Sequence, residues 1–352
     1  MPFALMADVH LHAWSAFSTT LPDGMNSRLA GLLLEIERAA LEVKAAGGHI
    51  VVIAGDLFHV RGSVKPSVLN PIRDLMHTLG IDHGIQFIVL AGNHDLEGRD
   101  ATRLSSAVTA LEGNDCWVIN EPTYIDAIKT LMVPWIENIE ELKKTIEAQV
   151  LPLERAKSNL IIHAPIDGVI DGLPASGLTP DYLNELGFKR VYAGHYHNHR
   201  RFCEGKVVSI GPLAHHTWNE IGCLAGFLLV NDVDFSWRKS HLPEFVDLAK
   251  LAETLTDETD IGLMVDGNFV RVKVAATKVK EVEAARKELL DLGARAVLVQ
   301  AEPAAPIREG TERATVESGA SLEVSVAGFA KTQPNPDEVA KAALDILSIV
   351  EA

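Results

Sequence analysis

The chain has 352 residues, 47% hydrophobic and 23% charged, which is long for one domain and typical of a globular protein with a core. Its formal net charge of −16 argues against a simple non-specific nucleic-acid binder, which would carry a basic face. Three scattered cysteines show neither disulfide nor metal spacing and favour a reducing compartment. Without a leader pattern or a membrane-length apolar run, we expect a soluble, cytoplasmic protein that makes no membrane contact.

The first part of the chain alternates short apolar runs with helical patterns. A buried strand is expected inside the segment His49–His59, because its first half is a run of aliphatic residues. A helix before it has a cap at Asn26 or Ser27 and a stop at Gly47-Gly48. The expected elements are strand Phe3–Ala7, helix Arg28–Ala46, the strand in His49–His59, and a helix from Pro66 to His77 or Leu79.

The alternation of strands and helices continues to about residue 240. The expected strands are Gln86–Leu90, Cys116–Ile119, Tyr124–Val133, Asn159–Ile162, Arg190–Ala193, Lys206–Ile210, Gly226–Val230 and Asp232–Arg238. The expected helices are Thr102–Leu111, Glu137–Glu147 and Pro180–Leu186. This order predicts an α/β domain, whose active site belongs at the carboxyl ends of its strands.

The composition changes near residue 245, and no histidine follows His241. A polar linker after Leu251 leads to a smaller strand–helix–strand pattern and then to a loop rich in proline and glutamate. We therefore divide the chain into a catalytic domain of residues 1–245 and a small α+β domain of residues 246–352 without catalytic chemistry. The elements expected in the second domain are strand Asn268–Val274, helix Val279–Leu292, strand Ala296–Gln300, loop Glu302–Arg313, strand Ser321–Val326 and a helix from Asp337.

Polar residues with metal-binding side chains follow five of the expected strands. Each alone has an ordinary structural explanation, as a capped turn, a turn residue or a core histidine. A carboxylate at the end of a buried strand is nevertheless costly unless it is paired, and a cation commonly pairs with it. Five such strand ends together indicate a metal centre. The residues are Asp8 and His10, Asp56, Asn93 and His94, His163, and His195 with His197.

The ligand types in these positions limit the metal and the chemistry. Oxygen and imidazole ligands without thiolates favour Mn, Fe or Zn, and mixed ligation argues against a pure Ca or Mg cage. Seven side chains from this set are already too many for one ion, but they suit two ions that share a carboxylate. Such a pair, ~3.5–4 Å apart, activates water and clamps phosphoryl oxygens. The sequence therefore predicts hydrolysis of a phosphate ester.

The motifs DVH, GDLFH, GNHD, a single histidine and GHYH, in this order, resemble those of the calcineurin-like metallophosphoesterases. GDLFHVR, AGNHD and the later IGPLAHHTW resemble the SbcD-type double-strand-break-repair nucleases, including phage-encoded relatives. The resemblance implies two packed mixed β-sheets flanked by helices, with the last segment as a small DNA-capping domain. It also implies DNA as substrate, an SbcC-like ATPase partner and a homodimer formed through helices such as Arg28–Ala46 or Pro66–Leu79.

Carried over by motif, the resemblance implies two metal ions, Mn first, with Mg, Fe or Zn as alternatives. One would be held by Asp8, His10, Asp56 and His197, and the other by Asp56, Asn93, His163 and His195. His94 would stabilise the transition state and help protonate the leaving oxygen, with Asp95 orienting its ring. His59 would contact a phosphate; its alternative reading is a surface-loop histidine.

The sequence also departs from the pattern of these nucleases. Four further histidines, near the motifs, have no assigned role: His12, His199, His215 and His216. The leading hypothesis is a two-metal DNA phosphodiesterase with exonuclease or endonuclease activity. Its alternatives are a metallophosphoesterase acting on a nucleotide or small phosphodiester, which the acidic charge favours, and a metal-stabilised scaffold subunit.

Overall fold

The computed structural model describes residues 1–99, 101–149, 152–248, 258–275, 279–302, 328–331, 333 and 335–342. The chain divides into two compact units. One comprises Met1–Lys273 and Lys280–Gln300, and the other comprises Val274–Val279 and Ala301–Ala352. Several expected segments lie outside the described residues: the linker after Leu251, the strand Ser321–Val326, and all but the first residue of the loop Glu302–Arg313. Of the expected helix from Asp337, the structure describes the beginning, and residues 336–342 are helical.

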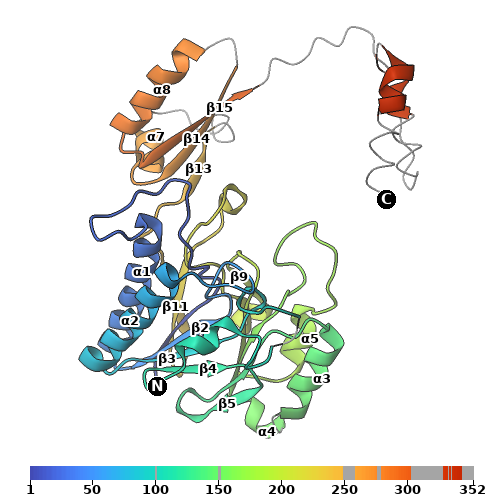
Figure 1. Cartoon of the computed structure of the whole chain (residues 1–352). Coiled ribbons are helices and arrows are strands. Elements are labelled where there is room, and N and C mark those ends of the chain that lie inside the picture. The colour runs from blue at the N-terminus through green and yellow to red at the C-terminus, as the bar shows by residue number, and fades with distance from the viewer. Residues whose placement is uncertain are drawn as a thin grey trace. The chain divides into compact units, whose positions relative to one another are not determined.

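One mixed six-stranded sheet contains the first four strands of the chain, β1 to β4, together with the later strands β11 and β12 (Figure 1). Its strand order is β12-β11-β1-β2-β3-β4. The four strands β1 to β4 are parallel, and β11 and β12 continue the sheet in antiparallel register. Their bounds are β1 (Phe3–Met6), β2 (Ile50–Ala54), β3 (Gln86–Leu90), β4 (Cys116–Ile119), β11 (Gly226–Val230) and β12 (Phe235–Lys239).

A second mixed six-stranded sheet has the order β5-β6-β7-β8-β10-β9. Its four central strands are parallel, and the edge strands β5 and β9 are antiparallel to their neighbours. The bounds are β5 (Thr123–Ile125), β6 (Thr130–Val133), β7 (Asn159–His163), β8 (Arg190–Gly194), β9 (Arg200–Phe202) and β10 (Val207–Ser209).

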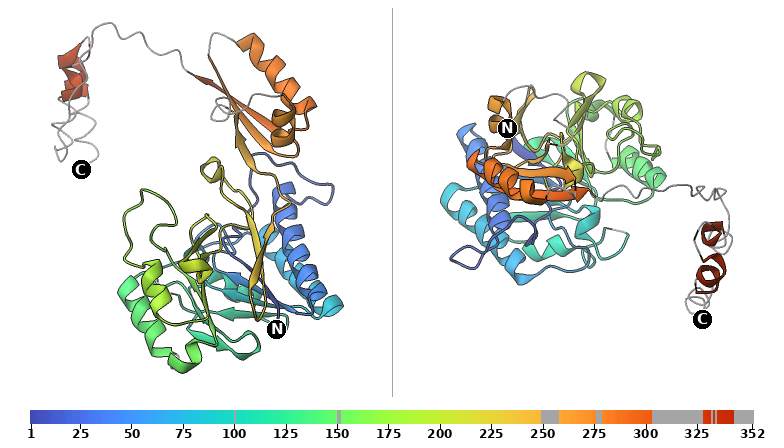
Figure 2. Two further views of the ribbon diagram at one scale, coloured as in Figure 1. Left: turned by 180° about the vertical axis from the view of Figure 1, so that it is seen from behind. Right: turned by 90° about the horizontal axis from the view of Figure 1, so that it is seen from above.

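Helices flank both sheets, as the views in Figures 1 and 2 show. The helix α1 begins where the Asn26 side chain accepts hydrogen bonds from two backbone amides, and α2 ends at Gly84, whose left-handed conformation suits glycine. The helices are α1 (Ser27–Ala45), α2 (Pro66–His83), α3 (Ile139–Gln149), α4 (Pro152–Arg155) and α5 (Pro180–Glu185). Short 3-10 turns are η1 (Asn93–Asp95), η2 (Ala107–Leu111), η3 (Asp126–Ile128), η4 (Cys203–Gly205) and η5 (Trp218–Glu220).

The alternation of side chains along the strands builds three apolar layers. In β1, Ala4 and Met6 face the cluster that contains α1 and α2, whereas Phe3 and Leu5 face the second sheet. A third cluster packs the other face of the second sheet against α3 and α5. Two mixed sheets flanked by helices confirm the predicted fold class, and they bring the carboxyl ends of parallel strands from both sheets to one edge.

Two of the expected elements are wrong. Only η2 forms in the expected helix Thr102–Leu111, because the side chains of Thr102 and Ser105 bond to each other's backbone amides and compete with helical hydrogen bonds. The expected strand Tyr124–Val133 is two antiparallel strands, β5 and β6. The turn η3 and the left-handed Lys129 reverse the chain between them.

A three-stranded sheet follows, with the order β13-β14-β15. Its elements are β13 (Phe245–Asp247), α7 (Glu258–Val265), β14 (Phe269–Ala275), α8 (Val279–Asp291) and β15 (Ala296–Glu302). The sequence predicts β14, α8 and β15, whereas β9, β13 and α7 are additional. A small cluster around Val265, Val270 and Leu289 is buried. Across the described ranges, no helix is long and apolar enough to cross a membrane.

Candidate metal centre

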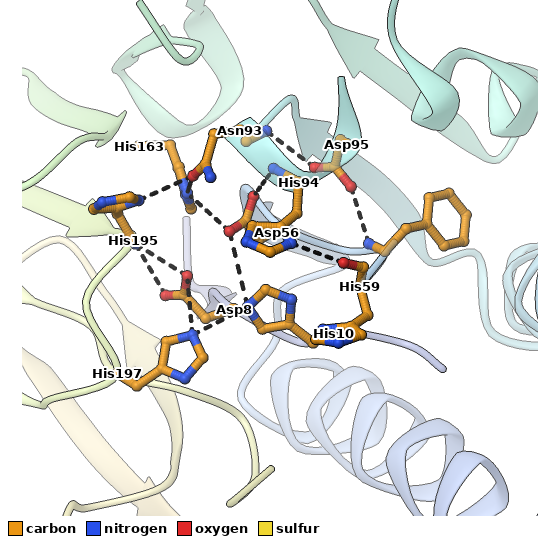
Figure 3. A network of polar contacts seen from close by, with 12 residues as sticks. Asp8, His10, Asp56, His59, Asn93, His94, Asp95, His163, His195 and His197 are labelled. Atoms are coloured by element: carbon orange, nitrogen blue, oxygen red, sulfur yellow. Dashed lines mark hydrogen bonds and ion pairs between the residues drawn. The ribbon is translucent and has the colours of Figure 1, made fainter. Parts of the chain in front are cut away.

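Unusual backbone conformations turn several polar side chains toward one point at the ends of the strands. Asp8 and His10 follow β1 with φ of 50° and 47°, and Asp56 follows β2 with φ of 53°. These left-handed conformations are uncommon for residues other than glycine, and such strain clusters at functional sites. His195, directly after β8, also has a positive φ, of 104°. The strand ends are therefore shaped to aim these side chains inward (Figure 3).

Glycines immediately before Asp56, Asn93 and His195 let the strands approach closely. A Cβ at Gly55 would lie 2.1 Å from His163 Nδ1, and one at Gly194 would lie 2.5 Å from the carbonyl oxygen of Ala54. A Cβ at Gly92 would lie 2.3 Å from both the backbone nitrogen and Oδ1 of Asp56. Any side chain at these positions would force the two sheets or the turns apart. The glycines therefore set the spacing of the site.

One group of donors consists of Asp8, His10 and His197. The Nε2 atoms of His10 and His197 lie 3.0 Å apart, and His197 Nε2 lies 3.9 Å from Asp8 Oδ1. Asp8 is fully buried and His10 nearly so. Donor atoms that bind one ion with bonds of about 2.1 Å lie about 3 Å apart when the bonds are perpendicular, which this group approaches.

A second group consists of Asp56, His163 and His195, with Asn93 between the two rings. Asn93 Oδ1 lies 3.1 Å from His163 Nε2 and 2.9 Å from His195 Nδ1. When His163 is neutral, its Nδ1–H donates to the carbonyl oxygen of Ala54, so Nε2 and Asn93 Oδ1 are both acceptors and cannot bond to each other. Their convergence is typical of ligands to one cation.

Asp56 lies between the two groups. Its Oδ2 is 3.3 Å from His163 Nε2 and 3.8 Å from His10 Nε2, while its Oδ1 accepts a hydrogen bond of 2.7 Å from the backbone amide of His94. The amide fixes the carboxylate with one oxygen directed between both groups of histidines. This is the position of a carboxylate shared by two ions.

The buried environment favours neutral rings at His10 and His195 beside an ionised Asp56. Burial lowers the pKa of His195 to about 3, helped by the charge of His163, and burial also lowers the pKa of His10 well below its ordinary value. Burial tends to raise the pKa of Asp56, but the charge and hydrogen bond of His163 outweigh it and hold that pKa well below its usual range. Burial also tends to lower the pKa of His163, but the charge and hydrogen bond of Asp56 outweigh it and raise that pKa to about 9. Since a metal ion binds neutral imidazole and ionised carboxylate, a bound cation would take the place of the proton that Asp56 holds on His163.

His94 and His59 line a cavity of about 390 Å³ beside the two groups. His94 Nδ1 lies 2.7 Å from the carbonyl oxygen of His59, so Nδ1–H donates to it and Nε2 is the free ring nitrogen. His59 is half-buried, and its ring stacks against that of His94 with centroids 5.8 Å apart. His10, His59 and His94 also form a third group of donors close enough for an ion.

The position of Asp95 differs from the expectation that it orients the His94 ring. Its buried carboxylate accepts hydrogen bonds from the backbone amides of Leu57, Phe58 and Gly92. The turn η1 directs it away from the ring, whose Nδ1 is already paired with a backbone carbonyl. Asp95 therefore ties the β2 and β3 strand ends together.

The four further histidines divide between the site and its surroundings. His12 lies beside His59, with ring centroids 5.2 Å apart, and His199 Nδ1 lies 3.0 Å from the carbonyl oxygen of Ile210. His216 Nε2 lies 3.1 Å from the carbonyl oxygen of Asp8, and its ring stacks against Trp14. His215 Nε2 lies 2.8 Å from the carbonyl oxygen of Cys223.

The cavity residues that sequence reasoning missed include Trp14, Tyr196 and Glu220. Glu220 accepts a hydrogen bond from His197 Nδ1 and is 5% exposed. Burial tends to raise the pKa of its carboxyl, but the hydrogen bond from His197 and nearby positive charge hold it at about 2. The pattern Thr217-x-x-Glu220 is a capping-box signal that could have marked the turn, but it does not indicate the contact with His197.

The donor set fits a pair of divalent ions, because buried carboxylates, an amide oxygen and imidazoles converge in two groups joined by Asp56. Asp8, His10 and His197 with Asp56 would hold one ion, and Asn93, His163 and His195 with Asp56 the other. Nitrogen and oxygen donors without sulfur suit Mn, Fe or Zn and do not distinguish among them.

No curated protein sequence matches the chain. Solved structures with some likeness include a dimetal phosphatase from Danio rerio, 11% identical with a TM-score of 0.39, covering 68% of this chain and 99% of that one. Another is the nuclease MPE from Pseudomonas putida, 18% identical with a TM-score of 0.27, covering 58% of this chain and 66% of that one. Likeness at these TM-scores assigns no function.

The match to a protein family is much more extensive. The model of the calcineurin-like phosphoesterase family matches residues 1–199, which is more than half of the 352 residues. The match runs from β1 through the paired histidines after β8, and so includes every strand end that contributes to the two donor groups. The chain therefore belongs to the calcineurin-like phosphoesterase family, whose members are phosphoester hydrolases with a dimetal centre.

Proposed function

We propose that the protein is a DNA phosphodiesterase that depends on two divalent ions, Mn first, and acts as an SbcD-like exonuclease or endonuclease. The observation that supports the chemistry most strongly is the position of Asp56, whose Oδ2 lies within 3.8 Å of a histidine in each donor group. The DNA substrate is drawn from the resemblance of GDLFHVR and AGNHD to the SbcD-type nucleases. The role is end processing in DNA repair or recombination.

When bound, two divalent ions supply Lewis acidity, which polarises phosphoryl oxygens and acidifies water. His94 supplies the proton chemistry. The carbonyl oxygen of His59 holds one proton on His94 Nδ1, which leaves Nε2 as the nitrogen that exchanges protons. In the imidazolium form, Nε2 carries a second proton and passes it to the leaving oxygen, and the ring becomes neutral. The bond from its own backbone amide to Asp56 keeps His94 beside the shared carboxylate. His59, which lines the same cavity, binds a phosphoryl oxygen.

Cleavage of end-labelled DNA in Mn²⁺ tests the proposal, with His94→Gln as the main variant. Loss of a general acid costs about 10²–10⁴-fold in rate. His94→Gln is therefore expected to cut DNA that much more slowly while it still binds two Mn²⁺ ions. His49→Gln is the matched control, because His49 is exposed and precedes β2 at the end of the strand opposite Asp56. Equal cleavage by wild type and His94→Gln would reject the role of His94.

A second candidate substrate is a nucleotide or a small phosphodiester. The net charge of −16 supports it, because a long polyanion is repelled by an acidic surface. Turnover of bis-p-nitrophenyl phosphate together with no cleavage of single- or double-stranded DNA, at low salt and with excess Mn²⁺, would favour this substrate class. Cleavage of DNA that weakens steeply with added salt would favour the nuclease.

The partners proposed with this function are an SbcC-like ATPase and a second copy of the chain, in the cytoplasm. Residues 246–352 would act as the DNA-capping module, and residues 1–245 as the nuclease. Co-purification with a co-expressed SbcC-like subunit and a dimeric mass by light scattering are the expected results. A monomeric mass together with no co-purification of the ATPase subunit would contradict both proposed partners.

A further inference from the structure

The turn η5 and the residues before it lie against one of the two donor groups. The Thr217 hydroxyl accepts a hydrogen bond of 3.3 Å from the backbone amide of Asn219. Glu220 Oε2 accepts a hydrogen bond of 2.7 Å from the amide of Thr217 and another from the amide of His216. These bonds hold the Glu220 carboxylate in one orientation by its second oxygen, so its first oxygen is free to point elsewhere.

That first oxygen, Oε1, contacts His197 Nδ1. An ionised carboxylate only accepts hydrogen bonds, so His197 carries a proton on Nδ1, and the neutral ring has its lone pair on Nε2. Nε2 is the atom that lies 3.0 Å from His10 Nε2 and within 3.9 Å of Asp8 Oδ1. The contact with Glu220 therefore selects the one tautomer of His197 that can bind a cation in this group.

The two donor groups differ in how their rings are oriented. His163 Nδ1 lies 2.8 Å from the backbone carbonyl oxygen of Ala54, whereas the ring of His197 is held by a carboxylate. The same loop reaches the first group a second time, because His216 Nε2 lies 3.1 Å from the carbonyl oxygen of Asp8. Support from residues 216–220 is thus specific to the group of Asp8, His10 and His197.

We propose that Glu220 is a positioning residue for His197, fixing its tautomer and thereby the affinity of one of the two metal positions. The inference rests on the proposed metal-dependent function and extends it to a residue outside the ligand motifs. Carboxylates that orient a ligating histidine change metal affinity by about 10–100-fold when they are replaced. An effect of this size at one position only is the signature of such a role.

Glu220→Gln is the sharpest substitution, because it keeps the shape of the side chain and removes one acceptor. If the glutamine oxygen serves the two backbone amides, its NH₂ group faces His197 Nδ1 and drives the ring proton to Nε2. We expect one Mn²⁺ position to weaken by about 10–100-fold in calorimetric titration of the metal-free protein, with the other position within about twofold.

Thr217→Val is the matched control within the same turn. It removes the hydroxyl that caps η5 but keeps the Glu220 carboxylate, so it measures the effect of loosening the turn alone. Both Mn²⁺ positions are expected to keep their affinities in this variant. An equal one-site loss in Thr217→Val and Glu220→Gln would overturn the proposal, because turn stability would then explain both.

The tautomer itself is read by ¹⁵N-histidine NMR of the metal-free protein, with His197→Gln identifying the signal. Wild-type His197 is expected to be protonated at Nδ1 and the Glu220→Gln protein at Nε2. An Nε2-protonated His197 in the wild type would overturn the proposal without any variant. An unchanged tautomer together with unchanged metal affinity in Glu220→Gln would overturn it even if the wild type cuts DNA. The expected shifts in a protein that cuts no DNA would support Glu220 and reject only the DNA substrate.

Discussion

Replacement of Gly92 by alanine tests whether the strand ends must pack as closely as the structure shows. Gly92 precedes Asn93 at the end of β3 and has φ −96° and ψ 177°, so alanine can adopt its backbone conformation. The added Cβ, however, would lie 2.3 Å from both the backbone nitrogen and Oδ1 of Asp56. The substitution therefore perturbs the shared carboxylate by steric overlap alone.

The size of the effect follows from that overlap. Ordinary van der Waals contact begins at 3.4 Å, so the atoms must move apart by about 1.1 Å from a separation of 2.3 Å. A backbone amide cannot rotate away, and Asp56 must move with its strand end. Overpacking of this kind costs about 1–3 kcal/mol of stability. A displacement of about 1 Å in a catalytic group reduces turnover by about 10²-fold.

The assay compares Gly92→Ala with Gly98→Ala, at which an added Cβ meets nothing within 4 Å. Turnover of bis-p-nitrophenyl phosphate in Mn²⁺, Mn²⁺ titration and thermal unfolding are measured for both. Gly92→Ala is expected to lose about 10²-fold in turnover and to unfold at lower temperature, whereas Gly98→Ala stays near wild type. Wild-type metal affinity and turnover within about twofold in Gly92→Ala would refute the geometry of the site.

Three further outcomes are expected. In calorimetric titration, Asp56→Ala should lose both Mn²⁺ positions, whereas Asp8→Ala should lose only one, because Asp56 Oδ2 lies within 3.8 Å of donors in both groups. Equal Mn²⁺ stoichiometry in the two variants would contradict a shared carboxylate. Mn²⁺ at 100 times its Kd should raise the free energy of unfolding by about 2.7 kcal/mol per site, reversibly with EDTA, and no change in urea unfolding would argue against metal binding to the folded state. Burial, with Glu112 and Asp115, raises the pKa of Cys116 from 9.0 to about 12, so its contribution to stability is complete below pH 9 and is lost as the pH rises toward 12. The stability difference between wild type and Cys116→Ala should therefore shrink by about 1.4 kcal/mol per pH unit above pH 9, and a constant difference in denaturant unfolding would be the contrary result.

The strand ends were predictable because their physics is local. A buried parallel strand reads as an aliphatic run, and the carboxyl ends of such strands meet at one sheet edge, so Asp8, Asp56 and Asn93 are brought together. The second sheet adds His163 and His195 by the same rule, which also explains why the fold class could be predicted.

Contacts between segments distant in sequence could not be predicted. The carboxylate of Asp95 is next to the His94 ring in sequence, yet η1 directs it to amides 37 and 38 residues away. Glu220 meets His197 across 23 residues, through a turn whose capping pattern says nothing of its partner. The expected helix at Thr102–Leu111 failed because short polar side chains bonded to the backbone, which a helical pattern does not reveal.

The most direct test is anomalous scattering from crystals of the full chain grown with Mn²⁺. Two peaks about 3.5–4 Å apart are expected on either side of Asp56 Oδ2. One should contact Asp8, His10 and His197, and the other should contact Asn93, His163 and His195. A single peak, or a peak held instead by His10, His59 and His94, would contradict a dimetal centre built around Asp56.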